Sequence, residues 1–487
     1  MRKSFSRQGR FDGGSVLDVV LNFENRDEIV PVLAALQYVF ADTSLRNSIT
    51  RLVAADINRD SRRDIGREGF NDWQVVVLSA VRLGCNLDYD KLHDLCENHR
   101  TLRGILGVGD WDDATSFGWR RIRDTLCLLR PSTIQEINHL IVKRGQQLDG
   151  SARERVRADS FVIETNIHYP TESSLIMDGV RKIIPICVEL ADELGESGWR
   201  QSKHQLKQIK KRARIISQIS SSKSPKVKDA LRGCYEKLLT RVNHLLERAK
   251  ALQVLAKKKG GTPQSLIQAK ELQGWIELTE QVCDTANRRV LLGETVPNTE
   301  KLFSLFETHT QLYRRGKAGR PNQFGRLLLV FEDSAGFISH YHLMDRNALD
   351  KDVAVEQTRE VQKLHQGEIT NASFDRGFYS PENVEELSKI VKHPCLPPKP
   401  PKEYAEQLKN GSVEFHRSRL HHAGIESAIG ALQSGNGLGR CRDRGEIGFE
   451  RYIGLAVLGR NLHVLGKLVI ATNNAESEAA KSERKAA

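Results

Sequence analysis

Two kinds of hydrophobic pattern divide this chain. Apolar residues recur at helical spacing through roughly the first 150 residues and again in a later basic stretch between residues 200 and 286. Short runs typical of strands occupy residues 156–163, 325–344 and 369–374, where apolar residues alternate with polar ones or form brief continuous blocks. The pattern predicts a mixed α/β core whose first strand is separated from the others by a long helical segment.

The first 150 residues are predicted to form a helical domain of short helices and tight turns. Asp112 and Asp113 are expected to cap the helix that carries Arg120 and Arg121. Short helices with a basic final helix are similar to a helix-turn-helix arrangement that reads DNA. An ordinary helical bundle with a solvated basic face is the alternative, and the pattern does not separate the two.

Basic residues are concentrated in one helical segment. Between Arg200 and Lys259, 18 Lys and Arg stand against three acids, a net charge of +15 that exceeds the +12 of the whole chain. The segment is predicted to be a helical hairpin, and Lys210, Lys211 and Arg212 lie on its first helix. Such a face suits a phosphate backbone, whose contacts release counterions and make binding salt-sensitive. A merely solvated face is the alternative.

The composition narrows the class of protein. The 487 residues are sufficient for several domains, and the basic balance favours a polyanionic partner. The eight cysteines form no CxxC pair, so neither a zinc site nor a disulfide framework is expected. The most apolar stretch, residues 452–471, is interrupted by Arg460, His463 and Lys467, which argues against a membrane span. We expect a soluble cytoplasmic protein with no membrane partner.

Three acids are candidates for chemistry. Asp159 lies inside the first predicted strand, where an unpaired acid is costly, although it could simply cap a loop at the end of that strand. Asp375 follows a later strand, at the position where ligands gather in α/β sheets, with an ordinary turn residue as the alternative. Glu426 is placed on a predicted helix over residues 414–432, with Arg419 and His422 on the same face.

Three sequence blocks together resemble the bacterial insertion-sequence transposases that carry a DDE catalytic triad on an RNase H-like fold. The blocks are RADSFVIETNIHYPTESSL, FDRGFYS and HHAGIESAIGALQSGNGLGRCRDRG. The resemblance implies that Asp159, Asp375 and Glu426 are the catalytic acids, and that Arg419 and the nearby Arg417 contact DNA. Two features depart from the family. The first two acids are 216 residues apart because the basic segment intervenes, and Gln433 stands where related enzymes often have Lys.

The resemblance also implies a domain plan and a reaction. An α/β RNase H-like core is expected from residues 151–180 and 321–471, with an all-α domain over 1–150. A basic helical insertion over 181–320 and a disordered tail over 472–487 complete this plan. Two Mg²⁺ ions, with Mn²⁺ as a substitute, would bind the three acids, as hard oxygen ligands require.

The implied activity is cleavage of double-stranded DNA at terminal inverted repeats, followed by strand transfer into target DNA. A homodimer associated with the bacterial nucleoid is the expected active form, because two ends react in one event. Two alternatives remain at this point. One is an RNase H-like nuclease without strand transfer, and the other is a non-catalytic DNA-binding protein from a decayed element.

Overall fold

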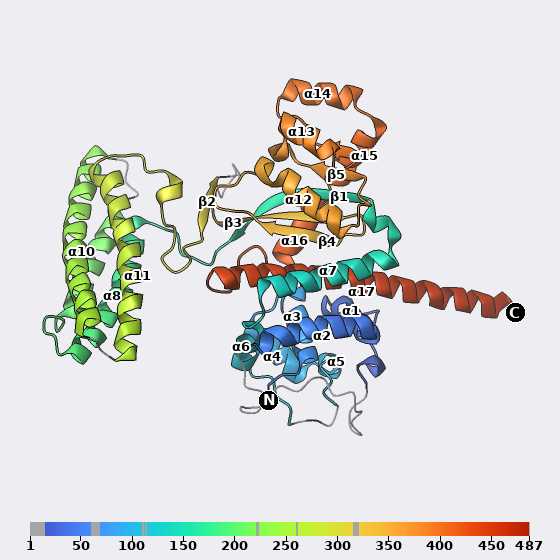
Figure 1. Ribbon diagram of the computed structural model, residues 1–487, viewed down its shortest axis with the longest axis horizontal. Helices are drawn as coiled ribbons and strands as arrows, with labels where there is room; N and C mark the ends of the chain where they lie inside the picture. Colours follow the sequence, from blue (N-terminus) through green and yellow to red (C-terminus); the bar gives the residue numbers. More distant parts are fainter. Residues whose placement is uncertain are drawn as a thin grey trace. The chain divides into compact units, whose positions relative to one another are not determined.

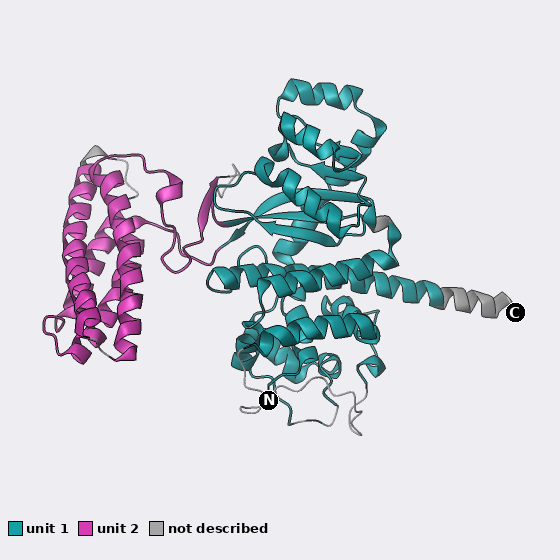
Figure 2. Cartoon of the chain, in the orientation of Figure 1, with its two compact units in different colours: residues 1–164, 326–487 teal, residues 165–325 magenta. Residues whose placement is uncertain are grey.

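The computed structural model describes residues 15–59, 69–109, 112, 114–220, 224–259, 262–314 and 321–486. The chain divides into two compact units (Figure 2). Unit 1 combines residues 1–164 with 326–487, and unit 2 consists of residues 165–325. The sequence predicts a helical insertion over 181–320. Unit 2 begins earlier than this, at residue 165, because it also includes the whole helix Glu172–Leu194.

A mixed sheet with helices on both faces organises unit 1 (Figure 1). The strand order is β2-β3-β1-β5-β6, with β4 also paired to β3. β1, β5 and β6 are mutually parallel, whereas β4 and β2 are antiparallel to β3. β2 belongs to unit 2 and pairs with the first residues of β3. The strands are β1 (Arg155–Glu164), β2 (Gln311–Arg314), β3 (Asn322–Asp333), β4 (Ile338–Leu343), β5 (Asn371–Phe374) and β6 (His393–Cys395).

The amino-terminal helices and the last helix share one core with the sheet. α17 packs against α1, α3 and α7, and its buried Asn461 bonds both Asn138 of α7 and the backbone of Ile338 in β4. A Cβ on Gly459 would collide with the backbone of Gly84, so glycine allows α17 to approach α3 closely. The helices are α1 (Ile29–Ala41), α2 (Thr43–Ile57), α3 (Asp72–Gly84), α4 (Tyr89–Asn98), α5 (Arg100–Ile105), α6 (Trp119–Leu126), α7 (Pro131–Leu148) and α17 (Glu446–Ala486).

The segment Glu446–Glu476 of α17 is long and apolar enough to cross a membrane, judged by length and composition alone. Of its most apolar part, 67% is buried inside the protein. Burial against α1, α3 and α7 is what the core helix of a globular unit shows, so the hydrophobicity of this helix has a sufficient cause in packing.

The remaining helices of unit 1 follow β4 along the chain. α12 packs near β4, whereas α15 contacts β1, β5 and β6, and α16 contacts β1. They are α12 (Asp350–Leu364), α13 (Pro381–Ser388), α14 (Pro401–Asn410), α15 (Val413–His422) and α16 (Ile425–Ser434).

Unit 2 is built mainly from four long helices around a second hydrophobic core. α10 and α11 pack on each other, and α8 packs on both α9 and α11. The predicted basic hairpin is therefore two of four helices, and α8 supplies much of the apolar surface that the hairpin covers. The four are α8 (Glu172–Leu194), α9 (Ser202–Ile219), α10 (Pro225–Lys259) and α11 (Pro263–Ala286).

Several local predictions agree with the structure. β3 and β4 form an antiparallel hairpin that contains the strand-like residues 325–344, and β5 ends directly before Asp375, as expected. Ser380 caps α13, accepting a hydrogen bond from the backbone N–H of Asn383, and Pro381 is its first residue. Strand patterns, helix caps and a proline at the start of a helix involve residues close together in the chain, so the sequence alone can indicate them.

Three local predictions are wrong. The helix expected over residues 414–432 is two helices, because the chain breaks at Ala423 and Gly424 between α15 and α16. α6 begins at Trp119 after Gly118, whereas Asp112 accepts bonds from Thr115 in a preceding turn; Asp113 lies outside the described residues. The segment from residue 472, expected to be disordered, continues α17 as far as Ala486.

Asp333, the last residue of β3, makes the stability of the fold depend on pH. It is 1% exposed, and burial raises its pKa to about 7, although Gln146 and two backbone N–H groups donate to it. The unfolded carboxyl ionises near pH 4, so the free energy of unfolding falls as pH rises from about 4 to about 7. We expect Asp333→Asn to reduce this fall by roughly 2 kcal/mol between pH 5 and pH 7.

Urea unfolding of both proteins at the two pH values measures this difference. Equal pH dependence in the wild type and the variant would show that another group is responsible.

Candidate functional site

Asp159 and Asp375 occupy equivalent positions on neighbouring parallel strands. Ala158 of β1 stands opposite Phe374, the last residue of β5, so an aspartate follows each of these paired residues. Side chains at the same register of adjacent parallel strands point to the same face, and the strands are about 4.8 Å apart. Asp159 is half-buried and Asp375 is exposed at the carboxyl end of β5. The fold therefore brings together two acids that are 216 residues apart.

The face that carries these two acids is covered by α15. Residues two positions earlier on the same strands identify it, because alternate residues share a face. Arg157 donates from Nη1 to the carbonyl oxygen of His421 at 2.7 Å, and the Ser373 hydroxyl lies 3.3 Å from Nδ1 of His422. Both partners are the last residues of α15.

Glu426 lies in the first turn of α16, which begins where α15 ends. The preceding residue, Ile425, is buried in the core that contains Phe161 and Ile163, which follow Asp159 at alternate positions of β1. α16 thus packs on the same face as the two aspartates, and the Glu426 side chain is exposed. All three acids suggested by the sequence belong to unit 1 and to one face of its sheet.

The three acids do not converge on one point. Within the described ranges of the chain, no three His, Cys, Asp or Glu side chains lie close enough together to hold one metal ion. The donor set nevertheless suits a hard cation, because it consists of carboxylate oxygens only. Of the three, Asp159 and Asp375 are the pair that the backbone register places on adjacent strands.

Arg419 places a permanent positive charge next to Asp375. Its Nη1 donates to the carbonyl oxygen of Phe374 at 3.1 Å, directly before that aspartate. Burial and the charge of Arg419 lower the pKa of His422 to about 4, while Asp375 acts in the opposite direction. His422 is therefore neutral near pH 7, and Arg419 supplies the cationic character of this part of the site.

Arg157, which sequence reasoning missed, holds the site together. Its Nε donates to the buried Glu332 of β3 at 2.6 Å, while Nη1 caps α15 through the His421 carbonyl. A Cβ on Gly424 would collide with this guanidinium, so the helix break requires glycine for space. Only the alternation of β1 places Arg157 on the face of Asp159, and nothing in the sequence indicates its partners.

Asp350, a fourth acid, lies at the same end of the strands on the opposite face. It accepts a hydrogen bond from the Ser160 hydroxyl at 2.6 Å, and Ser160 is the neighbour of Asp159 on β1. A Cβ on Gly377 would lie 2.9 Å from its carboxylate, so this glycine is required for space and not for a positive φ. Sequence reasoning did not identify Asp350.

The other predicted DNA contacts differ in how freely their side chains are presented. Arg417 is exposed and lies 3.4 Å from Glu414. Arg120 and Arg121 are exposed on α6 and stack on Trp119 and Phe70, respectively.

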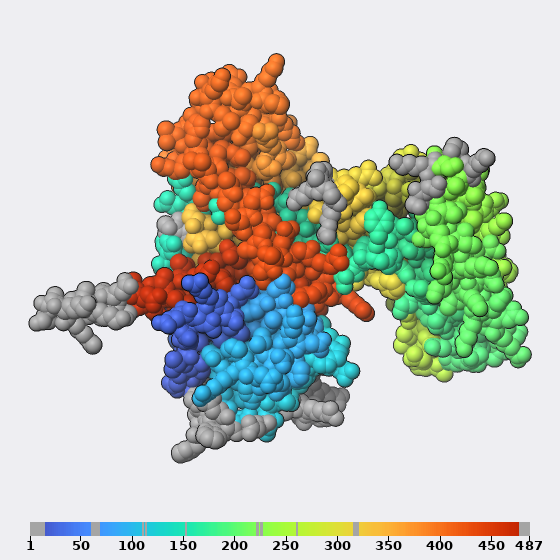
Figure 3. Space-filling model, turned by 180° about the vertical axis from the view of Figure 1, so that it is seen from behind, coloured from blue at the N-terminus to red at the C-terminus, as the bar shows by residue number. Residues whose placement is uncertain are grey.

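On α9, Lys210 and Lys211 are exposed, whereas Arg212 is half-buried with its Nε enclosed. Lys210 and Lys211 make no ion pair within the described residues. α9 contains six basic residues and no acid, and α9 and α10 form much of the surface of unit 2 in Figure 3.

Comparison with known proteins gives no match, whether with protein-family models, curated proteins or solved structures. The residues and their geometry are therefore the basis for any assignment of function.

Gly424 provides a direct test of the helix break. We expect Gly424→Ala to destabilise the protein by about 1–3 kcal/mol, because the added Cβ displaces the half-buried guanidinium of Arg157 from its bonds to Glu332 and His421. Gly430→Ala, on the exposed side of α16 with open space around it, is the matched control. It should stabilise the protein by up to about 1 kcal/mol through helix propensity. Urea unfolding measures the change in stability of each variant. A change of the same sign in both variants would contradict this account of Gly424.

Proposed function

We propose that this protein is a DDE transposase with an RNase H-like catalytic core. In this proposal it cleaves DNA at the ends of an insertion sequence and transfers the strands into target DNA. The observation that carries the proposal is the strand register. Asp159 and Asp375 follow paired residues of two central parallel strands, and the helix with Glu426 in its first turn packs on the same face. Each acid alone could be a capping or turn residue. Such roles do not explain why all three acids lie on the same face of the sheet.

The residues of the site fit divalent metal chemistry on phosphodiesters. Bound Mg²⁺ ions, or Mn²⁺ in their place, would activate the attacking oxygen and neutralise charge on the phosphate. Asp159 and Asp375 would hold the ions from the sheet, and Glu426 would complete the ligand set from α16. Arg419, fixed on the carbonyl of Phe374, is positioned to attract the DNA backbone toward Asp375.

Unit 2 would supply the nonspecific part of DNA binding. α9 has no acidic residue, and its exposed lysines lack carboxylate partners among the described residues. Such charges have little effect on the fold but raise the local concentration of a polyanion. Terminal inverted repeats and target DNA are the proposed partners, and a homodimer is the proposed active form because two ends must react in one event.

The catalytic assignment predicts a separation of cleavage from binding. We expect Asp159→Asn, Asp375→Asn and Glu426→Gln each to lower Mg²⁺-dependent cleavage of end DNA by about a hundredfold or more, since each removes a metal ligand. Duplex affinity should change less than about threefold, because these acids make no attractive contact with phosphates. Glu382→Gln, an exposed acid in the first turn of α13, is the matched control and should cleave normally.

The assay has three informative outcomes. Normal cleavage by any of the three variants would remove that acid from the triad. Cleavage by the wild type without joining to target DNA would identify a nuclease without strand transfer. DNA binding with neither reaction would identify a non-catalytic DNA-binding protein.

The role of α9 predicts a change in salt dependence. Replacing Lys210 and Lys211 by Gln should reduce the slope of log affinity against log salt concentration by about 2, because two phosphate contacts are lost. The control replaces Lys402 and Lys409, two exposed lysines of α14, and should leave the slope unchanged. Equal slopes for the α9 variant and the wild type would assign this face to solvent.

A further inference from the structure

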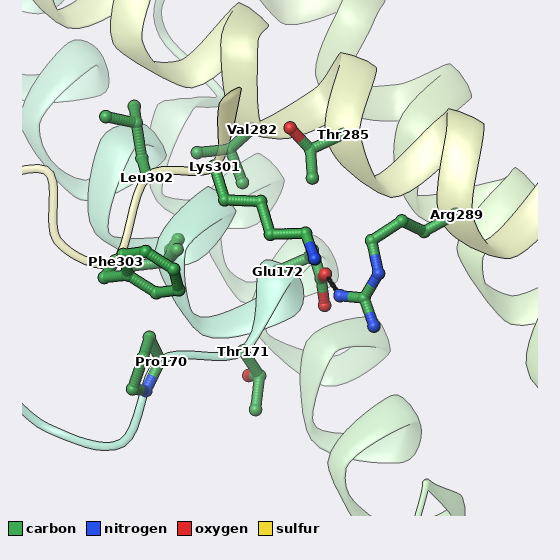
Figure 4. Close-up of a pocket in the computed structure, with 10 residues that line it drawn as sticks. Pro170, Thr171, Glu172, Val282, Thr285, Arg289, Lys301, Leu302 and Phe303 are labelled. Carbon is green, nitrogen blue, oxygen red and sulfur yellow. Dashed lines mark ion pairs between the residues drawn. The ribbon is translucent and has the colours of Figure 1, made fainter. Parts of the chain in front are cut away.

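A small pocket with both charged and apolar lining residues lies within unit 2 beside the first turn of α8 (Figure 4). Three separate segments line it: the start of α8 with Glu172, the end of the α11 region with Arg289, and the loop that carries Lys301. Its cavity volume is about 60 Å³. Figure 4 shows the side chains of Lys301 and Arg289 extending toward Glu172 from different parts of the chain.

Positive charge is concentrated around Lys301. Burial, followed by the charges of Arg289 and Arg314, lowers the pKa of its ammonium group. A lysine that is half-buried and faces two arginines is electrostatically unfavourable unless an anion is close. The arrangement is therefore one that a bound anion would stabilise.

The nearby acids are already engaged with other groups. Glu172 forms an ion pair with Arg289, and Arg288 bonds Glu294 at 2.9 Å and Glu300 at 2.7 Å. Within the described residues Lys301 forms no ion pair, and its ammonium group donates a long hydrogen bond of 3.4 Å to the side-chain oxygen of Asn298. The pocket thus keeps one cation whose charge is not matched by a carboxylate.

The end of α8 adds to the positive potential. α8 has 23 residues, and its N-terminus, capped by the Thr171 hydroxyl, borders the pocket. A helix N-terminus favours negative charge. This contribution supplements the cations and would not define a site alone.

We propose that this pocket binds one phosphate group of the DNA backbone. A volume of about 60 Å³ corresponds to roughly four water molecules, enough for a phosphate but too small for a base or a nucleoside. Lys301 would contact the phosphate oxygens directly. Arg289 is held by Glu172 and would add charge from the opposite wall. The identification of DNA as the source of the phosphate rests on the proposed function.

The test compares charge loss inside and outside the pocket, using the full chain and a fluorescent duplex. We expect Lys301→Gln to weaken binding about fivefold and to lower the salt slope by about 1, as the loss of one phosphate contact requires. Lys301→Arg should restore most of the affinity. Lys270→Gln removes the same charge from the exposed surface of α11 and should change binding less than about twofold. Thermal unfolding of each variant checks that the fold is retained.

Equal effects of Lys301→Gln and Lys270→Gln would overturn the proposal. Inorganic phosphate, titrated by calorimetry, distinguishes the source of the ligand. The heat of phosphate binding could depend on Lys301 while DNA binding does not. This result would mean that the pocket binds free phosphate, and it would overturn the assignment to DNA.

The catalytic proposal fails separately. DNA binding that depends on Lys301, in a protein that does not cleave DNA, would support the phosphate pocket and contradict the transposase proposal. A Lys301→Gln variant that cleaves DNA normally and binds it with full affinity would contradict only the phosphate pocket.

Discussion

The buried ion pair between Arg157 and Glu332 is the constraint on which the sheet and its covering helices depend. The Glu332 side chain is 2% exposed, and burial raises its pKa even though Arg157 acts in the opposite direction. Two charges are tolerated at such a position because each is bonded to the other, and losing one partner typically costs about 3–5 kcal/mol. Arg460 of α17 lies 3.9 Å from the same carboxylate, so β1, β3 and α17 meet at one buried charge.

This pair also determines where the helices on the sheet end. The guanidinium of Arg157 occupies the space in which a side chain at residue 424 would lie, and it bonds the last turn of α15. α15 ends and α16 begins at this point. Glu426 lies in the first turn of α16 next to β1, on the same face as Asp159 and Asp375. The geometry of the candidate site is thus a consequence of a structural ion pair that takes no part in the proposed chemistry.

Sequence reasoning predicted the features that depend on neighbouring residues and missed those that depend on contacts between distant residues. Strand alternation identified the segment of Asp159, and the strand-like run over residues 369–374 placed Asp375 at a strand end, because those signals involve neighbours in the chain. The break at Gly424 could not be predicted, since Ala423 and Gly424 are compatible with a continuing helix. The bond made to the end of α15 at this break comes from Arg157, 264 positions from His421 in the chain. The same holds for the pairing of β1 with β5, which requires the fold and not a motif.

Charge illustrates the same difference between composition and structure. Counting residues located the basic segment of unit 2 correctly, but it could not show which cations lack partners. The lysines of α9 are solvated, so they remain at little cost whether or not a polyanion is present. Lys301 lies outside that segment and is half-buried beside Arg289 and Arg314, a position that is unfavourable without an anion. An unmatched, partly buried cation therefore indicates a binding site more specifically than a high density of exposed ones.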